Sequence, residues 1–292
     1  TNVKLAVSKK VLLKNTYLKK ILLINDFEAV GYGINMLAKK DIATIKRAKK
    51  IPKAPIIVIG AGTGLGKTTL IYDSGYKSYI PIPSEAGNGD FPAQDHQELE
   101  LVNFIKKYKK IKQNVSYERV LSGQGLSNIY SFLRKSKNMP ATEYTKEIDM
   151  SVNRRAISEH AQMSKMQCIF EHTRKSKIFD ESSIFDKSGN LPELISKYRK
   201  MDPACKEAFR IFKIVYAKFA RNLALDCMAF GGVYIAGGIA PKNRGIFDKE
   251  FISNFERNYA HADILKKIPV YLIINYNVGL LGAGFAGAKF LK

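Results

Sequence analysis

The fold is decided by two stretches, Leu23-Ile24-Asn25-Asp26-Phe27-Glu28 and Gly60-Ala61-Gly62-Thr63-Gly64-Leu65-Gly66. The first predicts an apolar strand that ends in Asn-Asp where a helix begins. The second follows the apolar run Pro-Ile-Ile-Val-Ile and is a glycine loop, whose backbone N–H groups are able to close on phosphate oxygens. A carboxylate near a phosphate loop favours a kinase.

Around these stretches, predicted strands alternate with predicted helices. We expect strands at 18–25, 55–59, 233–236 and 270–274, a strand or hairpin within 68–83, and helices at 26–37, 95–110, 202–230 and 279–292. We expect 39–55 to be a surface connection and 135–200 to contain helices of unassigned bounds. Strands that alternate with helices and end in glycines predict an α/β fold with its site at the strand ends.

The charge of the chain, +22 over 292 residues, raises the question of a nucleic-acid partner. Lysine outnumbers arginine and is spread along the chain, whereas surfaces that clamp phosphate favour arginine and interleaved aromatic residues. We therefore expect a solvated basic surface and no specific nucleic-acid partner, with specific binding as the alternative. Weak salt-sensitive binding to polyanions fits either interpretation.

The apolar segments argue against a membrane span, and the cysteines indicate a reducing compartment. No uninterrupted apolar run reaches the roughly 20 residues of a membrane span, and Thr1-Asn2-Val3-Lys4 lacks the pattern of a secretory signal. Cys168, Cys205 and Cys227 are widely spaced, so packing is favoured over a disulfide or a zinc site. We expect a cytoplasmic protein without membrane contact.

Asp26 and Asn25 admit a structural and a chemical interpretation. A strand-to-helix turn is the usual place for a helix cap, which is the simpler role for Asp26. The chemical alternative is a general base that takes a proton from an alcohol as phosphate arrives, with Asn25 bound to a sugar hydroxyl.

The glycine loop also nearly matches a P-loop, Ala61-Gly62-Thr63-Gly64-Leu65-Gly66-Lys67-Thr68. A P-loop requires a helix directly after Lys67-Thr68. The residues from Thr69 to Tyr76 are β-branched, aromatic and interrupted by glycine, so they predict a strand and a turn. A P-loop NTPase is thus the minority alternative.

Two glutamates and a second glycine cluster complete the candidate site. Glu85 and Glu118 lie in Gly- and Ser-containing loops on either side of the helix 95–110, where they either face a ligand or are merely solvated. The cluster from Gly231 to Gly238 encloses a short strand. It provides either close helix–strand packing or room for a flat adenosine.

Taken together, the motifs resemble the bacterial glucokinase family of the hexokinase–actin superfamily. They occur in that family's order over nearly the whole chain: Asn25-Asp26-Phe27, Gly60 to Gly66, Ser84-Glu85, Glu118 to Gly123, Arg221-Asn222-Leu223-Ala224-Leu225, Gly231 to Gly238 and Gly279-Leu280-Leu281-Gly282. Each motif alone is weak, and the ordered set is specific.

The resemblance implies an actin/hexokinase-like two-lobe fold and ATP-dependent phosphorylation of the glucose 6-hydroxyl with Mg²⁺. Its residues would be Asp26 as base, a sugar set of Asn25, Glu85, Asn88 and Glu118, a phosphate set of Gly62, Thr63 and Gly64, and Gly237 and Gly238 beside adenosine. No residue is assigned as a metal ligand. Residues 1–37 would be a remnant of the small lobe, 38–276 the large lobe, and 277–292 a helix that returns to the small lobe. A homodimer is expected.

Three features depart from the family pattern. The sugar loop Ser84-Glu85-Ala86-Gly87-Asn88 stands where the family has Ser-Glu-Gly-Gly-His, which leaves sugar specificity open, and a positive φ at Ala86 would cost about 1 kcal/mol. Lys67 after the glycine loop is unusual and would add a phosphate contact. No Gly-Gly-Thr of the family's N-terminal Asp-x-Gly-Gly-Thr hairpin occurs. We therefore expect a truncated small lobe and impaired turnover, with a sugar-binding pseudokinase as the alternative.

Overall fold

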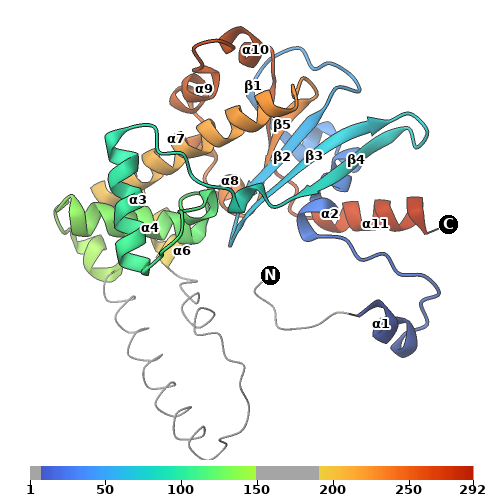
Figure 1. Cartoon of the computed structure of the whole chain (residues 1–292), viewed down its shortest axis with the longest axis horizontal. Helices are drawn as coiled ribbons and strands as arrows, with labels where there is room; N and C mark the ends of the chain where they lie inside the picture. Colours follow the sequence, from blue (N-terminus) through green and yellow to red (C-terminus); the bar gives the residue numbers. More distant parts are fainter. Residues whose placement is uncertain (1–7, 149–190, 292) are drawn as a thin grey trace, which may run out of the picture.

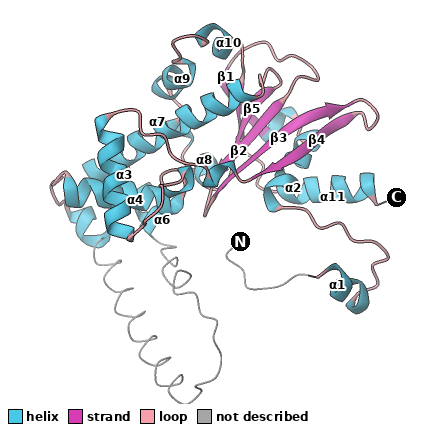
Figure 2. Cartoon of the chain, viewed as in Figure 1, coloured by secondary structure: helices cyan, strands magenta, loops and turns pink. Residues whose placement is uncertain are grey.

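A computed structural model of the chain describes residues 8–148 and 191–291 (Figure 1). Its centre is one six-stranded sheet in the order β1-β6-β5-β2-β3-β4, with helices on both faces (Figure 2). β5 runs parallel to β2 and to β6, and the other pairs are antiparallel. The strands are β1 (Ile42–Lys46), β2 (Ile56–Ala61), β3 (Leu65–Asp73), β4 (Ser78–Ser84), β5 (Gly232–Ala236) and β6 (Val270–Ile273).

Helices were predicted at 26–37, 95–110, 202–230 and 279–292 and within 135–200, and the structure has further helices that were not predicted. The α-helices are α1 (Lys9–Asn15), α2 (Asp26–Gly33), α3 (His96–Lys109), α4 (Gly123–Ser136), α6 (Leu191–Tyr198), α7 (Pro203–Asp226), α8 (Ile239–Lys242), α9 (Lys249–Glu256), α10 (Ala262–Lys266) and α11 (Val278–Phe290). The 3₁₀ turns are η1 (Ile34–Met36), η2 (Lys39–Asp41), η3 (Ala86–Asn88), η4 (Tyr117–Arg119) and η6 (Arg244–Ile246). Residues 143–148 are also helical.

Side-chain alternation along β2 divides the apolar core between the two faces of the sheet. Ile57 and Ile59 point into a large core that α4, α7 and α9 cover, which we call the broad face. Ile56 and Val58 point to the opposite, narrow face, which carries a smaller core beneath α2 and η1. α11 packs along α2 on this second side.

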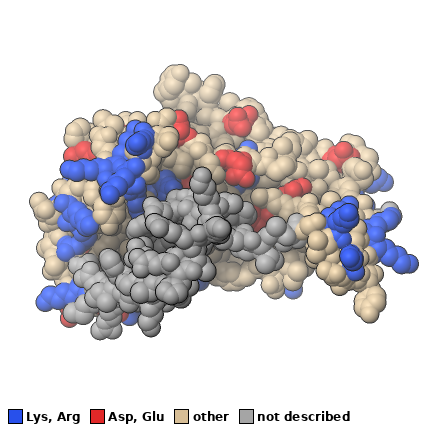
Figure 3. All heavy atoms as spheres, turned by 60° about the horizontal axis from the view of Figure 1, so that its bottom comes forward, with Lys and Arg blue, Asp and Glu red and all other residues tan. Residues whose placement is uncertain are grey.

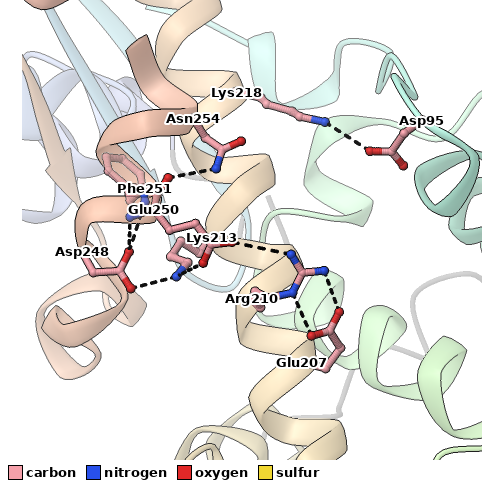
Figure 4. Close-up of polar contacts among 9 residues, drawn as sticks. All are labelled: Asp95, Glu207, Arg210, Lys213, Lys218, Asp248, Glu250, Phe251 and Asn254. Carbon is pink, nitrogen blue, oxygen red and sulfur yellow. Dashed lines mark hydrogen bonds and ion pairs between the residues drawn. The ribbon is translucent and has the colours of Figure 1, made fainter. Parts of the chain in front are cut away.

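Ion pairs of two largely buried lysines on α7 tie the helices of the broad face together (Figure 4). The Lys213 ammonium lies 2.9 Å from Asp248 Oδ2 and 2.6 Å from Glu250 Oε2, which belong to the cap of α9 and to α9 and are themselves exposed. Farther along α7, Lys218 lies 2.5 Å from Glu98 Oε1 on α3, and both of these side chains are largely buried. Removing Glu98 would leave the Lys218 charge unpaired in a poorly solvated place, so this pair in particular fixes α3 against α7.

Three of the predicted segments differ from the structure. Residues 18–25 form no strand, and Leu22 and Leu23 are 40% and 52% exposed. A strand needs a hydrogen-bonded neighbour, and no described strand reaches this segment. The supposed connection 39–55 contains β1, because Ile42 to Lys46 pair with β6 and Lys46 donates to the carbonyls of 265, 266 and 268. The predicted helix 202–230 ends earlier, at Asp226, since Met228 turns the chain with φ 52°.

The hairpin, the strand at 55–59 and the helices at 95–110 and 279–292 are confirmed within a few residues. Cys205 is fully buried and Cys227 half-buried, as predicted for packing cysteines, whereas Cys168 lies outside the described residues. Most of the predicted helical segment 135–200 also lies outside them.

On the face that Figure 3 shows, basic side chains gather toward the two ends of the molecule. Within 8–148 and 191–291, no helix combines the length and apolar character that a bilayer crossing requires.

Candidate active site

The Asn-Asp turn begins α2, and Asn25 is its cap. Asn25 Oδ1 accepts the backbone N–H groups of Phe27 (2.7 Å) and Glu28 (3.4 Å), and Glu28 Oε2 accepts the N–H of Asn25 (3.3 Å). This capping box identifies Asn25, not Asp26, as the capping residue. Asp26 lies in the first helical turn with an exposed side chain, its Oδ1 2.8 Å from the Phe27 N–H. The hydrogen bonds of this turn therefore use neither the second carboxylate oxygen of Asp26 nor the Nδ2 group of Asn25.

Phe27 joins this turn to the glycine hairpin. Its ring covers two glycines that face each other across β2 and β3, Gly60 and Gly66. A Cβ on Gly60 would lie 2.7 Å from Phe27 Cζ, and one on Gly66 would lie 2.1 Å from Phe27 Cδ2. Both glycines are thus required for the ring to dock. The docked ring fixes Asp26 beside the end of the hairpin.

The two glycine loops follow the carboxyl ends of two neighbouring strands, β2 and β5, and so lie at the same end of the sheet. Because β2 and β5 are parallel, Gly62 after β2 and Gly238 after β5 end up together. A Cβ on Gly62 would find only Gly238 N, at 4.0 Å, and one on Gly238 would find nothing within 4 Å. Thr63 lies exposed at the loop tip between them and β3. The Gly62 N–H donates to Gly64 O within the loop at 2.8 Å, whereas the Gly238 N borders the open space. A backbone N–H beside such open space suits a phosphate oxygen.

Some glycines of the second cluster allow close packing, and one borders open space. A Cβ on Gly231 would lie 2.4 Å from Ala54 O, so this glycine serves close packing. Gly237 has φ 85°, and a Cβ there would lie 2.5 Å from Ala61 O. Only Gly238 opens onto free space, so the packing and adenosine interpretations each account for part of the cluster.

The P-loop alternative is wrong. β3 runs without interruption from Leu65 to Asp73, where a P-loop requires a helix. Lys67 is a strand residue, 9% exposed, opposite Ile59 of β2 and Ser84 of β4.

The predicted sugar loop follows β4 and packs against β3. Asn88 Nδ2 donates to Glu85 Oε2 at 3.2 Å, so these two exposed side chains are already paired. Ala86 has no positive φ and therefore carries no backbone strain. Gly87 is the residue that must lack a side chain, because a Cβ there would lie 2.1 Å from Leu65 O.

Glu118 reaches the glycine hairpin from the other side. It lies in η4, which the Tyr117 N–H ties to Gly89 O of the sugar loop at 2.9 Å. Its Oε2 accepts the backbone N–H of Leu65, the first residue of β3, at 2.9 Å. The hairpin thus has Asp26 on one side and Glu85, Asn88 and Glu118 on the other.

The supporting residues were not recognised in the sequence. The Tyr216 hydroxyl accepts the N–H of Ala61 at 3.4 Å beneath the loop, and burial raises the pKa of this phenol. Ser122 caps α4, whose first N–H, that of Gly123, donates to Gly62 O at 2.8 Å. The signal for Phe27 was present, since Gly60 and Gly66 fall opposite each other in a hairpin with a three-residue loop. The contacts of Tyr216 and Gly123 depend on segments far apart in the chain and left no local pattern.

The sheet order, with an antiparallel hairpin on one side of β2 and parallel strands on the other, together with glycine loops at its edge, defines an actin/hexokinase-like fold. The structure of a glucokinase from an Antarctic psychrotroph is similar, with a TM-score of 0.65 and 22% identity over 90% of this chain and 67% of that one. A glucokinase from Balamuthia mandrillaris, solved in complex with glucose, gives a TM-score of 0.61 and 19% identity over 89% and 63%.

The chain belongs to the glucokinase family, whose profile, described as Glucokinase, matches residues 1–289. A glucokinase from a Nostoc species is 36% identical over 272 residues, which make up 92% of this chain and 71% of that protein. A glucokinase from Salmonella arizonae is 32% identical over 286 residues, or 97% of this chain and 74% of the relative.

Proposed function

We propose that the chain phosphorylates the 6-hydroxyl of glucose with ATP. The observation that carries the proposal is the docking of Phe27 on Gly60 and Gly66. It places the carboxylate of Asp26 and the glycine loop at one end of the sheet, next to the loops of Glu85 and Glu118. A base, a phosphate loop and sugar acceptors around one hairpin are the parts that phosphoryl transfer to an alcohol needs.

In this proposal Asp26 accepts the proton of the sugar 6-hydroxyl, and Asn25 donates a hydrogen bond to the sugar through Nδ2. Glu85 and Glu118 accept hydrogen bonds from other hydroxyls, while Asn88 holds the Glu85 carboxylate. Such acceptors orient the sugar oxygen toward the loop, and orientation accounts for most of the gain in a reaction with little covalent work for the protein.

The nucleotide site is assigned to Gly62, Thr63, Gly64, Gly237 and Gly238. Its support is the space beside Gly62 and Gly238, which the Gly238 N–H borders and side chains do not fill. ATP would supply the phosphoryl group, its terminal P–O bond to ADP breaking as the bond to the sugar oxygen forms. Mg²⁺ belongs to the proposal as the counterion of the ATP phosphates. Within the described ranges, no three Asp, Glu, His or Cys side chains are gathered to hold it.

Family membership supports three further assignments. They are a small-lobe segment at 1–37 with a large lobe at 38–276 and a returning helix at 277–292, a homodimer, and a cytoplasmic location. The packing of α11 against α2 supports the first. Sedimentation of the purified chain with and without glucose tests the dimer.

The test of the proposed function is release of ADP from Mg-ATP by the purified chain, with and without glucose. We expect release that depends on glucose and that falls by about 10²–10⁴-fold in Asp26→Asn. Lys67→Ala is the matched control, since Lys67 lies on β3 outside the assigned site. Unchanged turnover in Asp26→Asn would overturn the role of Asp26.

A second candidate is glucose binding without turnover. It predicts glucose binding in a calorimeter and no ADP release from Mg-ATP with or without glucose, so the ADP assay separates the two candidates.

A further inference from the structure

Two glycines of the hairpin loop, two residues apart, meet different surroundings. A Cβ on Gly64 would lie 2.7 Å from Oε2 and 3.5 Å from Cδ of Glu118, whereas one on Gly62 would meet only Gly238 N at 4.0 Å. Neither glycine has a positive φ. Backbone conformation therefore requires glycine at neither position, and only at Gly64 is the space already taken by a carboxylate.

The same carboxylate oxygen accepts the backbone N–H of Leu65 at 2.9 Å. A hydrogen bond from N–H to an ionised acceptor is among the stronger protein hydrogen bonds, and it fixes the direction of the Glu118 side chain. The missing side chain at Gly64 lets Glu118 come close enough to form it.

The main chain of Glu118 has little freedom to retreat. Its carbonyl accepts the Ser122 hydroxyl at 2.7 Å, and the carbonyl of the next residue, Arg119, accepts Asn128 Nδ2 at 2.8 Å. On the other side, the Leu65 side chain is buried, with 6% exposed. A methyl group at position 64 would therefore move the end of the Glu118 side chain, which is flexible, and leave the two backbones in place.

We propose that Gly64, besides its assignment to the phosphate loop, is a positioning residue for the sugar that acts through Glu118. This inference rests on the proposed function through the assignment of Glu118 to the sugar. Gly62 then borders the nucleotide alone, whereas Gly64 also makes room for the sugar carboxylate. The Leu65 N–H, at the start of β3, donates a hydrogen bond to Glu118. The hairpin therefore connects a loop assigned to the nucleotide with a side chain assigned to the sugar.

The test compares Gly64→Ala with Gly62→Ala by calorimetric titration of glucose and, separately, of Mg-ATP. We expect Gly64→Ala to weaken glucose binding about 10- to 100-fold, the range for losing a hydrogen bond to a charged group. Gly62→Ala should weaken Mg-ATP binding and change glucose affinity less than Gly64→Ala does. An aspartate is one methylene shorter than a glutamate. Glu118→Asp should therefore be less harmful in the Gly64→Ala background than in the wild-type loop.

Amide exchange at Leu65 gives a readout that needs no ligand. We expect faster exchange of this N–H in Gly64→Ala than in Gly62→Ala, because only the first displaces its acceptor. If the two variants had equal glucose affinities and equal exchange rates at Leu65, the inference on Gly64 would be overturned. The proposed function would still stand, provided that the wild-type chain binds glucose. Wild-type chain that binds no glucose would overturn the proposed function, and the role of Gly64 toward sugar with it.

Discussion

The two sides of the sheet differ in how completely they are packed. The broad face holds a continuous core in which Leu126, Phe212 and Phe219 are at most 2% exposed, and ion pairs join its helices. On the narrow face, Leu23 before α2 is 52% exposed and Leu280 of α11 is 75% exposed.

The candidate site is divided in the same way. Glu85 and Glu118 lie in loops that close over the broad-face core, whereas Asp26 stands on the narrow face, where Phe27 provides its anchor. Three of the proposed sugar groups, Glu85, Asn88 and Glu118, thus rest on the well-packed side, whereas Asn25 and the proposed base lie on the thinly packed one. Rigid support matters most for groups that must hold a geometry, so binding and turnover should respond to different substitutions.

The largest difference is expected between two leucine-to-alanine substitutions. Leu126→Ala removes a buried side chain from α4 and should cost about 2–5 kcal/mol in the free energy of unfolding. Leu280→Ala acts on an exposed side chain and should change it by less than about 0.5 kcal/mol. Urea unfolding followed by circular dichroism measures both. Equal losses would show that the two faces are equally packed.

Phe27→Ala tests the anchor of the narrow face. The ring is half-buried, so its loss should cost about 1–2 kcal/mol of stability, less than Leu126→Ala. Since the ring fixes Asp26 beside the hairpin, turnover should fall more than glucose affinity. Phe27→Leu, which keeps apolar contact, is the control and should recover part of the turnover. Turnover that is insensitive to both changes would separate Asp26 from the hairpin.

Asp202 tests the broad face by pH. Burial acts to raise its pKa, but hydrogen bonds from the Thr142 and Thr145 hydroxyls and the Cys205 N–H outweigh this and hold the pKa below its ordinary value. The stability it supplies is therefore present above pH 3.8, the ordinary value, and is lost as pH falls through the lowered one. Asp202→Asn keeps the cap of α7, and we expect it to be less stable than wild type by about 1 kcal/mol at pH 7.

The pH series compares unfolding of wild type and Asp202→Asn between pH 7 and pH 3. The difference should stay constant down to about pH 4 and shrink below it. A difference that grows on acidification would contradict the lowered pKa.

The smallest effect concerns Cys227, where α7 ends on the broad face. Burial raises the pKa of this thiol to about 11, so little thiolate exists at neutral pH. The experiment uses a Cys168→Ser background, so that Cys205 and Cys227 are the thiols present. The folded chain should react with a disulfide reagent at pH 8 far more slowly than the chain unfolded in urea, in which both thiols are exposed. Equal rates would show that this end of the core is open.

How far the sequence predicts the molecule depends on the range of the contacts. The hairpin after Gly60 and the helix after Asp95 were predictable, because glycine, β-branched runs and capping residues act within a few positions. The conformation of 18–25 was predicted wrongly. Its apolar run matches a strand, but a strand forms only where a second strand lies beside it, and the local sequence does not show whether one does. β1 was concealed by the lysines around it, because its own Lys46 is buried and donates to the carbonyls of residues 265, 266 and 268, over two hundred positions away.

For the candidate site, residue types and order made Asp26, Glu85 and Glu118 candidates, whereas their contacts could be described only from the fold. Nothing local in the sequence distinguishes Gly62 from Gly64, because the difference is the approach of Glu118 from η4. The cap at Asn25 was equally hidden, since Asn and Asp side by side are both good capping residues.

The central claim is that the broad face supplies Glu85, Asn88 and Glu118 to the sugar, and that the narrow face supplies the base together with Asn25. Calorimetric titration of glucose into wild type, Asp26→Asn and Glu118→Gln tests it most directly. We predict that Asp26→Asn binds glucose within about threefold of wild type and that Glu118→Gln binds about tenfold or more weakly. Loss of binding in Asp26→Asn together with wild-type affinity in Glu118→Gln would contradict the account.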